Sequence, residues 1–577
     1  MPPRARDIRS FRAVGPYTLR FCLDMTDTFL TTAGWPRPWV QWLGLAIVLG
    51  IGLLVRLDAP EIGLMEARNF VAAREMHAGG SWLLPTMNGE LRLAKPPLPT
   101  WLVAGVMHLT GSTTDLGLLR LPSAAGACLL VLFFWALARR LTPPQDRGRT
   151  AWLAAVVLAS SLLLLTAGRD GNGWDIYCYC FMTGALAAAV RGLQSPGRGW
   201  GWFAAAGALI GLSILSKGPV APYGMLLPFL LACALRGDRA ALRRHWPGLV
   251  LMAGVGLLLG AAWPLYVLGQ HLSEASQVAQ TESSSWANRH VQPVWFYVSF
   301  PAFMGFWALA AGAALAWPYA APRIRPYAPY ALLLAWALAT LVLLSLVPEK
   351  KERYLLPVLP PLALLTAGLL RYWLSALRPT GADQWLLRAW AGVVGLALLA
   401  LPVALRLVRL ASFAPETPRY WLTSGLAVAA AAATWWLWRS GARARAAVAA
   451  TLSAVLLASG LLMPAYPEWQ RRRDDPGLRP LARVVRERAG LRHQPVLSVG
   501  EMQIKWIWAA GRVVPQWRPE VDSLPQLPVL VYAGARGTAP FPPSVARRFQ
   551  IETVDSFDLS HQFADGRWYV TEIRPRP

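Results

Sequence analysis

Long apolar runs constrain the possible structures of this chain more than any other feature. Residues 40–55 read VQWLGLAIVLGIGLLV, and comparable runs recur as far as residue 463. A helix needs roughly 20 predominantly apolar residues to cross the hydrocarbon core of a bilayer. The 577 residues are 55% hydrophobic and only 15% charged. The sequence therefore predicts a mostly α-helical, polytopic membrane protein.

Hydropathy predicts about thirteen membrane-spanning helices. The first is predicted to be retained rather than removed as a signal peptide, because no small-residue cleavage site follows it. The predicted spans lie near residues 40–56, 118–138, 151–167, 176–191, 202–216, 219–235, 247–268, 296–317, 328–347, 354–370, 386–405, 419–437 and 446–463.

The arginines predict the orientation of these spans. Residues 1–38 are basic, with Arg4, Arg6, Arg9 and Arg12, and cytoplasmic segments of membrane proteins are enriched in arginine and lysine. Every later gap that falls on the same side also carries arginine, and an odd number of spans places the C-terminus outside. The net charge of +25 is spread over these short gaps, so we expect no nucleic-acid partner.

The chain is predicted to have three parts. Residues 1–38 form the cytoplasmic N-terminus, and 39–463 form the transmembrane domain, with short outer-loop helices within 57–117. The character changes after residue 464, and 464–577 are predicted to be a small extracytoplasmic α/β domain. Its elements are short β-rich runs separated by Gly and Pro, together with one helix. The predicted strands lie in 494–500, 527–536, 549–557 and 567–573, and the helix in 481–490.

The outward-facing segments hold the acidic and basic residues that the spans exclude. These segments are 57–117, 166–175, 216–219, 269–295, 348–354 and the loop near 406–418. Charges at a membrane edge are costly unless they pair or bind a ligand, so this face is the candidate functional site. The alternative is that these charges are solvated and the loops merely pack at the interface.

Several short motifs occur in order on this face. The first outer loop contains E-x-R at 66–68, R-E-M at 74–76, G-x-W-x-x-P at 80–85, N-G at 88–89 and K-P-P at 95–97. GRDGNGWD (168–175), LSKGP (215–219) and EKKERYLLPVLPPLALL (349–365) follow. This order resembles the bacterial lipid-linked-sugar glycosyltransferases of the GT-C superfamily. The group it resembles contains the lipid A aminoarabinose transferase and the protein O-mannosyltransferases.

The resemblance implies sugar transfer from a polyprenyl-phosphate donor, such as undecaprenyl phosphate, at the periplasmic face of a bacterial inner membrane. The acceptor would be lipid A, a protein or a glycan. The lipid phosphate needs cations at the membrane surface. The candidates are Lys95, Lys217, Arg353 and the hydroxyl donor Tyr354, with Lys350 and Arg68 as further members.

The catalytic base is the least certain part of this prediction. The family has Asp-Glu in the first outer loop, with the aspartate as presumed base, whereas this chain has Met65-Glu66. Three alternatives follow: Glu66 is the base, Asp58 or Glu61 folds back to replace it, or the protein binds lipid-linked sugars or assists assembly without catalysis. Asp175 matches the aspartate of the second outer loop and is a further catalytic candidate.

The resemblance does not extend to a metal site. The family glutamate before Lys-Pro is Ala94 here, and the histidine after Glu282 is Ser283. A zinc site needs three or four ligands, so the sequence predicts no structural zinc and at most a weakly bound divalent cation. Glu282 and His290 are retained as loop or acceptor-side candidates.

Each charged candidate also has a plain structural alternative. Lys217 could anchor a helix end by snorkelling. Arg353 and Lys350 could bind lipid headgroups without taking part in catalysis. Arg169 could pair with Asp170 and Asp175 within their loop. A transporter is disfavoured, because charges are few within the spans, where transport sites lie.

Overall fold

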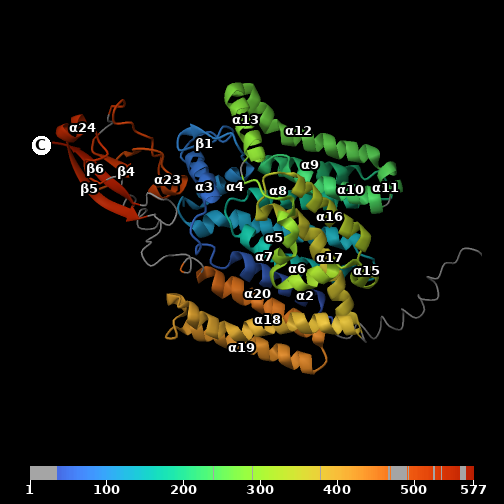
Figure 1. Ribbon diagram of the computed structural model, residues 1–577. Coiled ribbons are helices and arrows are strands. Elements are labelled where there is room, and N and C mark those ends of the chain that lie inside the picture. The colour runs from blue at the N-terminus through green and yellow to red at the C-terminus, as the bar shows by residue number, and fades with distance from the viewer. Residues whose placement is uncertain are drawn as a thin grey trace, which may run out of the picture.

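The chain forms a helical body with a small sheet domain at one end (Figure 1). This computed structural model describes residues 35–576 except 238, 289, 377–378, 466–467, 469–489, 492, 524–526, 535 and 559–566. The predicted cytoplasmic segment 1–38 lies almost wholly outside the described residues. The boundary at 464 between the two predicted domains stays a prediction.

All thirteen predicted spans coincide with helices or runs of helical segments. Within the described residues, eight helices are long and apolar enough to cross a membrane, and α6 with α7, bent by 60° at their junction, would form a ninth if they are one span. The full count of thirteen stays a prediction. The helical segments are α2 (Pro38–Leu49) with η1 (Gly50–Leu54), α5 (Leu116–Leu141), α6 (Arg147–Ala159), α7 (Leu162–Gly168), α8 (Trp174–Leu193), α9 (Trp200–Lys217), η2 (Pro222–Leu226), α10 (Leu227–Arg236), α12 (Trp246–Gln270), η3 (Val294–Trp307), α14 (Ala308–Leu315), α16 (Tyr330–Leu346), η4 (Glu352–Val358), α17 (Leu359–Ser375), α18 (Gly381–Val408), α19 (Pro418–Arg439), α20 (Arg443–Leu457) and η6 (Ala458–Leu462).

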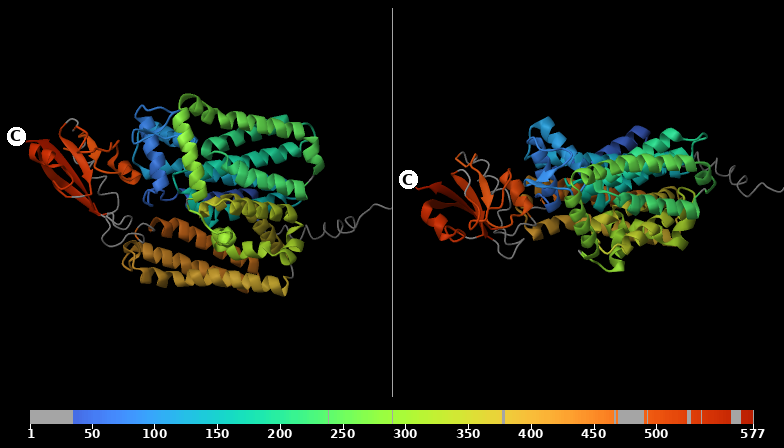
Figure 2. Two further views of the ribbon diagram at one scale, coloured as in Figure 1. Left: turned by 45° about the horizontal axis from the view of Figure 1, so that its top comes forward. Right: turned by 90° about the horizontal axis from the view of Figure 1, so that it is seen from above.

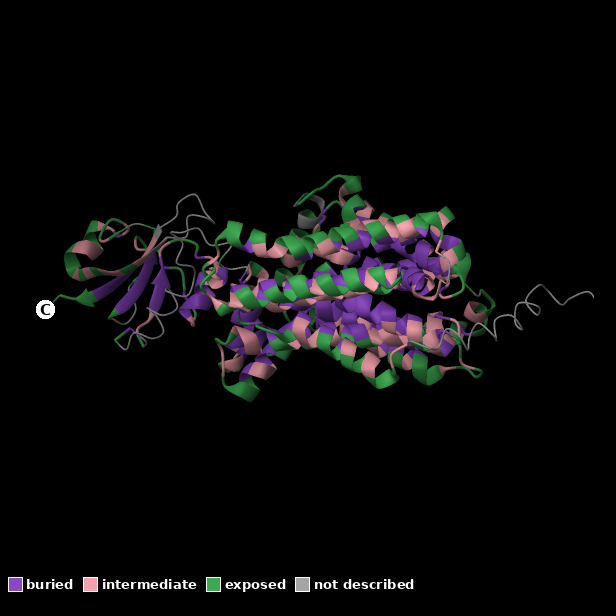
Figure 3. Cartoon of the chain, turned by 90° about the horizontal axis from the view of Figure 1, so that it is seen from below, coloured by how far each residue is buried: buried purple, intermediate pink, exposed green. Residues whose placement is uncertain are grey.

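The helices differ in how deeply they lie in the body. Residues of α8 and α17 are mostly buried, whereas α12 and α18 present most of their apolar residues outward. Figure 3 shows this as a buried interior between helices whose outer faces are exposed. Apolar residues facing outward on a soluble protein would be an aggregation hazard, but they are what a helix needs against lipid. The central helix α8 carries Asp175 at its first turn.

The first outer loop contains two helices and a hairpin. These elements are α3 (Leu64–His77), β1 (Thr86–Met87), β2 (Glu90–Leu91) and α4 (Leu98–Thr110). Asn88 and Gly89 have φ of 59° and 82°, the conformation that a tight hairpin turn requires. The N-G motif at 88–89 therefore forms the turn of this hairpin. Glu75 of α3 accepts hydrogen bonds from the Thr86 hydroxyl and the Asn88 N–H, both at 2.6 Å.

A four-stranded sheet of order β3-β4-β6-β5 forms the C-terminal domain. Its strands are β3 (Val496–Ser498), β4 (Val529–Ala533), β5 (Phe549–Asp558) and β6 (Arg567–Pro575). The β3–β4 pair is parallel, and the other two pairs are antiparallel. All four predicted strands are confirmed. The helices α23 (Ile504–Ala510) and α24 (Pro543–Arg548) were not predicted, and the predicted helix at 481–490 lies almost wholly outside the described residues.

The sheet domain docks on the first outer loop, and α3, β1 and α4 lie between it and the helical body (Figures 1 and 2). The Arg74 guanidinium donates to the backbone carbonyls of Ile507, Trp508 and Arg512 at 3.1–3.2 Å. The Asn88 side chain accepts from the Val514 N–H at 2.7 Å and donates to its carbonyl at 2.9 Å. Two of the motifs noted in the sequence thus carry this interface.

Candidate functional site

The loop between α7 and α8, residues 169–173, lies at the centre of the charged face. A Cβ on Gly171 would lie 2.4 Å from Phe70 Cζ and 2.9 Å from Glu66 Oε1, so only glycine fits there. Gly173 has φ of 67°, a left-handed conformation that favours glycine. Two glycines of the GRDGNGWD motif are therefore required by geometry. They let the loop pack directly on α3.

Glu66 is buried and pairs with a second buried charge, Arg120 of α5. The Arg120 Nε and Nη2 atoms donate to Glu66 Oε1 and Oε2 at 2.7 and 2.9 Å. Glu66 also accepts from the N–H groups of Gly63 and Gly171 at 2.7 and 2.6 Å. A carboxylate has about four acceptor positions, so all of those of Glu66 are in use. This pair joins three segments of the outer face.

Asp175 lies at the centre of a second charged cluster. The Lys217 Nζ hydrogen-bonds Asp175 Oδ1, and Arg353 Nε lies 3.7 Å from Asp175 Oδ2. Lys217 Nζ also sits 4.8 Å from the centre of the Tyr354 ring. The Arg353 Nε is buried without a hydrogen-bond partner among the described residues. The structure thus brings together four of the predicted site residues, Asp175, Lys217, Arg353 and Tyr354.

Lys95 and Glu282 form an ion pair of 2.9 Å at the same face. Their side chains are 24% and 37% exposed, so solvent screens this pair and it contributes little to stability. Glu282 belongs to α13 (Leu272–Asn288), which packs on the outer loop through an apolar cluster that includes Leu93. The predicted residues Lys95 and Glu282 are therefore partners, and Lys95 remains accessible from outside.

Asp170 has the most perturbed acidity of the outer loops. Burial and the nearby Glu66 carboxylate raise the pKa of Asp170 to about 7, although the Asn172 N–H and the Arg353 and Arg120 charges oppose the shift. Its Oδ1 accepts from the Asn172 N–H at 3.0 Å. A carboxylate that gains and loses its proton near pH 7 has the acidity of a general base.

Two predicted alternatives for the base lie away from the second cluster. Asp58 forms an exposed ion pair with Arg56 at 3.0 Å. Glu61 faces α23, where burial lowers the pKa of Lys505 and the Glu61 carboxylate opposes that shift. Both therefore sit at the edge of the first outer loop.

Three further candidates have other contacts. Lys350 is buried, and its Nζ donates to the carbonyls of Val347 and Gln292 at 2.7 and 3.0 Å. His290 accepts from the Lys350 N–H through its own carbonyl at 3.2 Å. Arg68 Nη1 lies 3.8 Å from Met65 Sδ. Among the described residues, none of these three side chains forms a hydrogen bond or ion pair with Asp175, Lys217, Arg353 or Tyr354.

The sequence analysis missed Arg120 and Arg92, and it gave Asp170 only a structural role. Arg120 lies within a predicted span, where an arginine is costly unless it is paired, and that cost was the signal for a partner. Arg169 was proposed to pair with Asp170 and Asp175. It donates instead to the carbonyls of Gly52 and Val55 at 3.0 and 2.6 Å, so that alternative is wrong.

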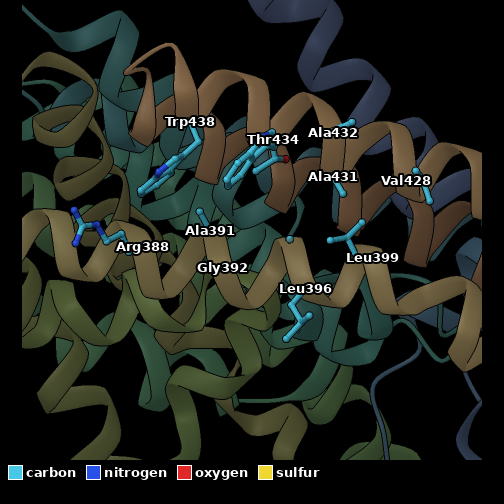
Figure 4. A pocket seen from close by; sticks show the side chains of 12 residues that line it. Arg388, Ala391, Gly392, Leu396, Leu399, Val428, Ala431, Ala432, Thr434 and Trp438 are labelled. Atoms are coloured by element: carbon cyan, nitrogen blue, oxygen red, sulfur yellow. The ribbon is translucent and has the colours of Figure 1, made fainter.

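In the part of the chain that the structure describes, no group of three or more His, Cys, Asp or Glu residues lies close enough together to hold a metal ion. A groove of about 640 Å³ lies elsewhere, between α18 and α19. Figure 4 shows its small and apolar lining, with Arg388 and Trp438 near one end. Its lining residues are distinct from the charged residues of the outer face.

Two family models match parts of the chain. The Dolichyl-phosphate-mannose-protein mannosyltransferase model matches residues 94–263, and the Alg9-like mannosyltransferase family model matches residues 289–416. The first match includes Lys95, Asp170, Asp175 and Lys217, and the second includes Arg353.

Several curated relatives share one name. The undecaprenyl phosphate-alpha-4-amino-4-deoxy-L-arabinose arabinosyl transferase of Pectobacterium atrosepticum is 28% identical over 359 residues, covering 58% of this chain and 60% of that protein. The protein of the same name from Pseudomonas paraeruginosa is 30% identical over 386 residues, covering 62% and 64%. The match thus spans less than two thirds of the length of these relatives.

Structural similarity extends over almost the whole chain. ArnT from Cupriavidus metallidurans, solved bound to undecaprenyl phosphate, superposes with a TM-score of 0.68 at 20% identity, covering 92% of this chain and 98% of that one. Its apo form gives the same TM-score at 21% identity. The chain therefore has the fold of ArnT. Over parts of its length its sequence is similar to the arabinosyl transferases and to two mannosyltransferase family models.

Proposed function

We propose that this chain transfers a sugar from a polyprenyl-phosphate donor to an acceptor at the extracytoplasmic face of a bacterial inner membrane. One observation carries the proposal: Lys217, Arg353 and Tyr354 gather around Asp175 at the outer ends of the helices. Such a cation cluster suits a lipid phosphate held at the membrane surface. The name of the related arabinosyl transferases, which includes undecaprenyl phosphate, agrees with this donor class.

In this proposal the cations stabilise the leaving group. As the bond between the anomeric carbon and the phosphate oxygen breaks, its electron pair passes to that oxygen, and negative charge grows there. Lys217 and Arg353 are held by Asp175 near the position of that charge, and Lys95 adds a third cation from the outer loop. Charge that is fixed in advance lowers the barrier because no reorganisation is needed.

The base in this proposal is Asp170 rather than Glu66. Glu66 already accepts four hydrogen bonds, so we assign it a positioning role between Arg120 and the Asp170 loop. Asp170 lies within electrostatic reach of both Glu66 and Arg353, and its pKa is raised to about 7. It would take the acceptor proton as the acceptor oxygen attacks the anomeric carbon in a single inverting displacement.

A binding or assembly protein without catalysis is the second candidate. Met65 stands at the position where the family has its presumed base, and its Sδ contacts Arg68 rather than offering a proton acceptor. In that case the same cations would hold a lipid-linked sugar that is not turned over.

A rescue experiment separates the two candidates. A knockout of the native host would be complemented with wild type, Asp170→Asn or Glu66→Gln, with membrane abundance measured for each. Envelope lipids, glycans and proteins would be compared by mass spectrometry. We expect a sugar mass to disappear in the knockout and to return with wild type, with Glu66→Gln partly restoring it and Asp170→Asn failing to do so.

The outcomes identify both the reaction and its substrates. The size of the lost mass gives the sugar class, and the molecule that carries it is the acceptor. Full restoration by Asp170→Asn at equal abundance would remove Asp170 as the base. If variants of Asp170, Glu66, Asp58 and Glu61 all restore the sugar, none of these carboxylates acts as the base. That result would favour the second candidate, a binding or assembly protein.

A further inference from the structure

Arg92 is a buried cation that forms no ion pair with a carboxylate among the described residues. It follows β2, and its backbone N–H donates to the Pro85 carbonyl at 2.8 Å, which closes the base of the hairpin. Arg92 is only 7% exposed to solvent. Within the described part of the chain its guanidinium has no hydrogen bond, and the Nη1 atom is fully buried. The sequence analysis did not single out this residue.

A second unpartnered donor lies beside it. The guanidinium carbon of Arg92 is 4.9 Å from the centre of the Trp174 ring. Trp174 is 2% exposed, and its indole Nε1 is also buried without a partner among the described residues. Buried donors in proteins nearly always have an acceptor. Two such donors side by side, on the face already proposed to bind substrate, indicate an acceptor that the chain itself does not supply.

The electrostatic surroundings indicate a negative acceptor. Burial and, to a smaller extent, the nearby charge of Arg68 lower the pKa of Arg92 to about 10, while Glu282 opposes the shift. The guanidinium therefore stays charged at neutral pH. Glu282 is already paired with Lys95. A buried charge needs an ion partner to offset its lost hydration.

We propose that Arg92 and the Trp174 indole N–H bind an oxyanion in addition to the lipid phosphate. This second oxyanion is a carboxylate on the transferred sugar, which is bonded to the lipid phosphate. Trp174 directly precedes Asp175, which holds Lys217 and Arg353, so the second oxyanion lies next to the Asp175 cluster. The inference rests on the proposed function and narrows it to a reaction with an acidic sugar.

Binding measurements on the full chain test this inference. The protein would be placed in phosphatidylcholine nanodiscs and titrated with polyprenyl phosphate, polyprenyl-phosphate-linked hexuronic acid and the matching neutral hexose derivative. A soluble sugar phosphate would then be titrated onto protein saturated with polyprenyl phosphate. The variants are Arg92→Gln, Arg92→Lys and the control Arg325→Gln, which changes an exposed arginine that has no part in the outer-face contacts described above.

One result supports the inference. Wild type prefers the hexuronic acid over the hexose by about tenfold or more, and Arg92→Gln removes that preference while polyprenyl phosphate binds as before. Arg325→Gln behaves as wild type. If wild type shows no such preference and the soluble sugar phosphate binds only with Arg92 in place, Arg92 binds an anion other than a sugar carboxylate and the inference is wrong.

Other results overturn it. An equal loss of affinity for all three lipids in Arg92→Gln would assign Arg92 to the lipid phosphate itself. Unchanged binding of every probe would mean that Arg92 only packs on Trp174. Should Arg92→Gln unfold, Arg92→Lys keeps the charge but loses the planar fork and must still weaken the selective probe. If wild type fails to bind polyprenyl phosphate, the proposed function is rejected as well. If only the selectivity is lost while polyprenyl phosphate still binds, the inference alone is rejected.

Discussion

At the scale of single residues, Glu66 and Asp170 show how position divides the work between two carboxylates. Asp170 belongs to the 169–173 loop and Glu66 packs against it, where Glu66 accepts four hydrogen bonds. Asp170 accepts from the backbone and side-chain amides of Asn172, and burial together with the Glu66 charge raises its pKa to about 7. The replacement of the family aspartate by Met65 therefore does not leave this face without a proton acceptor.

Asp170 leads to a prediction about pH. A carboxylate base acts only when deprotonated, and its pKa is raised to about 7, so wild-type activity should rise as the pH passes upward through 7. Asp170→Asn should lower the rate by about 10²–10⁴-fold and abolish this ascending limb. The measurement is a pH–rate profile of the reconstituted enzyme. An ascending limb that persists in Asp170→Asn would assign it to another group.

Glu66 leads to a prediction about stability. Glu66→Gln leaves the Arg120 guanidinium buried without its anion, and breaking such a pair costs about 3–5 kcal/mol. We expect a marked fall in the thermal unfolding midpoint in detergent. The control is Glu282→Gln, whose side chain is 37% exposed and whose loss should cost under about 1 kcal/mol. Equal midpoints for the two variants would contradict a structural role for the Glu66–Arg120 pair.

At the scale of elements, the 169–173 loop depends on glycine. Gly171→Ala would place a methyl group 2.4 Å from Phe70 Cζ, so the loop must shift away from α3, and Asp170 must move with it. We expect loss of both activity and thermal stability. Gly105→Ala in α4 is the matched control, because nothing lies within 4 Å of its added Cβ. Wild-type behaviour of Gly171→Ala would show that the loop tolerates displacement.

Sequence patterns predicted most elements because those elements follow local rules. Each apolar run coincides with a helix or a run of helical segments, and alternation with Gly and Pro breaks located four strands. The patterns did not predict α23, whose IKWIWAA sequence is buried against α3 and has no amphipathic period to read. The site was harder, because the Arg120–Glu66 and Arg92–Trp174 contacts join residues far apart in the chain. Lys217, Arg353 and Asp175 were found through motif order rather than spacing.

At the scale of the whole molecule, the sheet domain and the charged face are connected through the first outer loop. Arg74 and Asn88 hold the domain through backbone contacts, and Glu75 next to Arg74 holds the hairpin that leads to Arg92. The domain therefore rests on the same loop that forms the site. An acceptor or partner bound by the domain would lie next to the proposed reaction centre.

This arrangement leads to a prediction about docking. The double variant Arg74→Met and Asn88→Ala should loosen the domain, because five hydrogen bonds to it are lost. Hydrogen exchange of the α23 amides should speed up, while exchange in α8 stays slow. Arg325→Met serves as the control. Unchanged exchange in α23 would mean that apolar packing alone holds the domain.

The central claim is that the Asp175 cluster binds the phosphate of a polyprenyl lipid, and direct titration tests it best. Wild type and Arg353→Gln would be titrated with polyprenyl phosphate in nanodiscs, with Arg325→Gln as control and thermal unfolding as a check on folding. We predict that wild type and the control bind alike and that Arg353→Gln binds about tenfold or more weakly. Equal affinity in all three proteins, or no binding by wild type, would contradict the account.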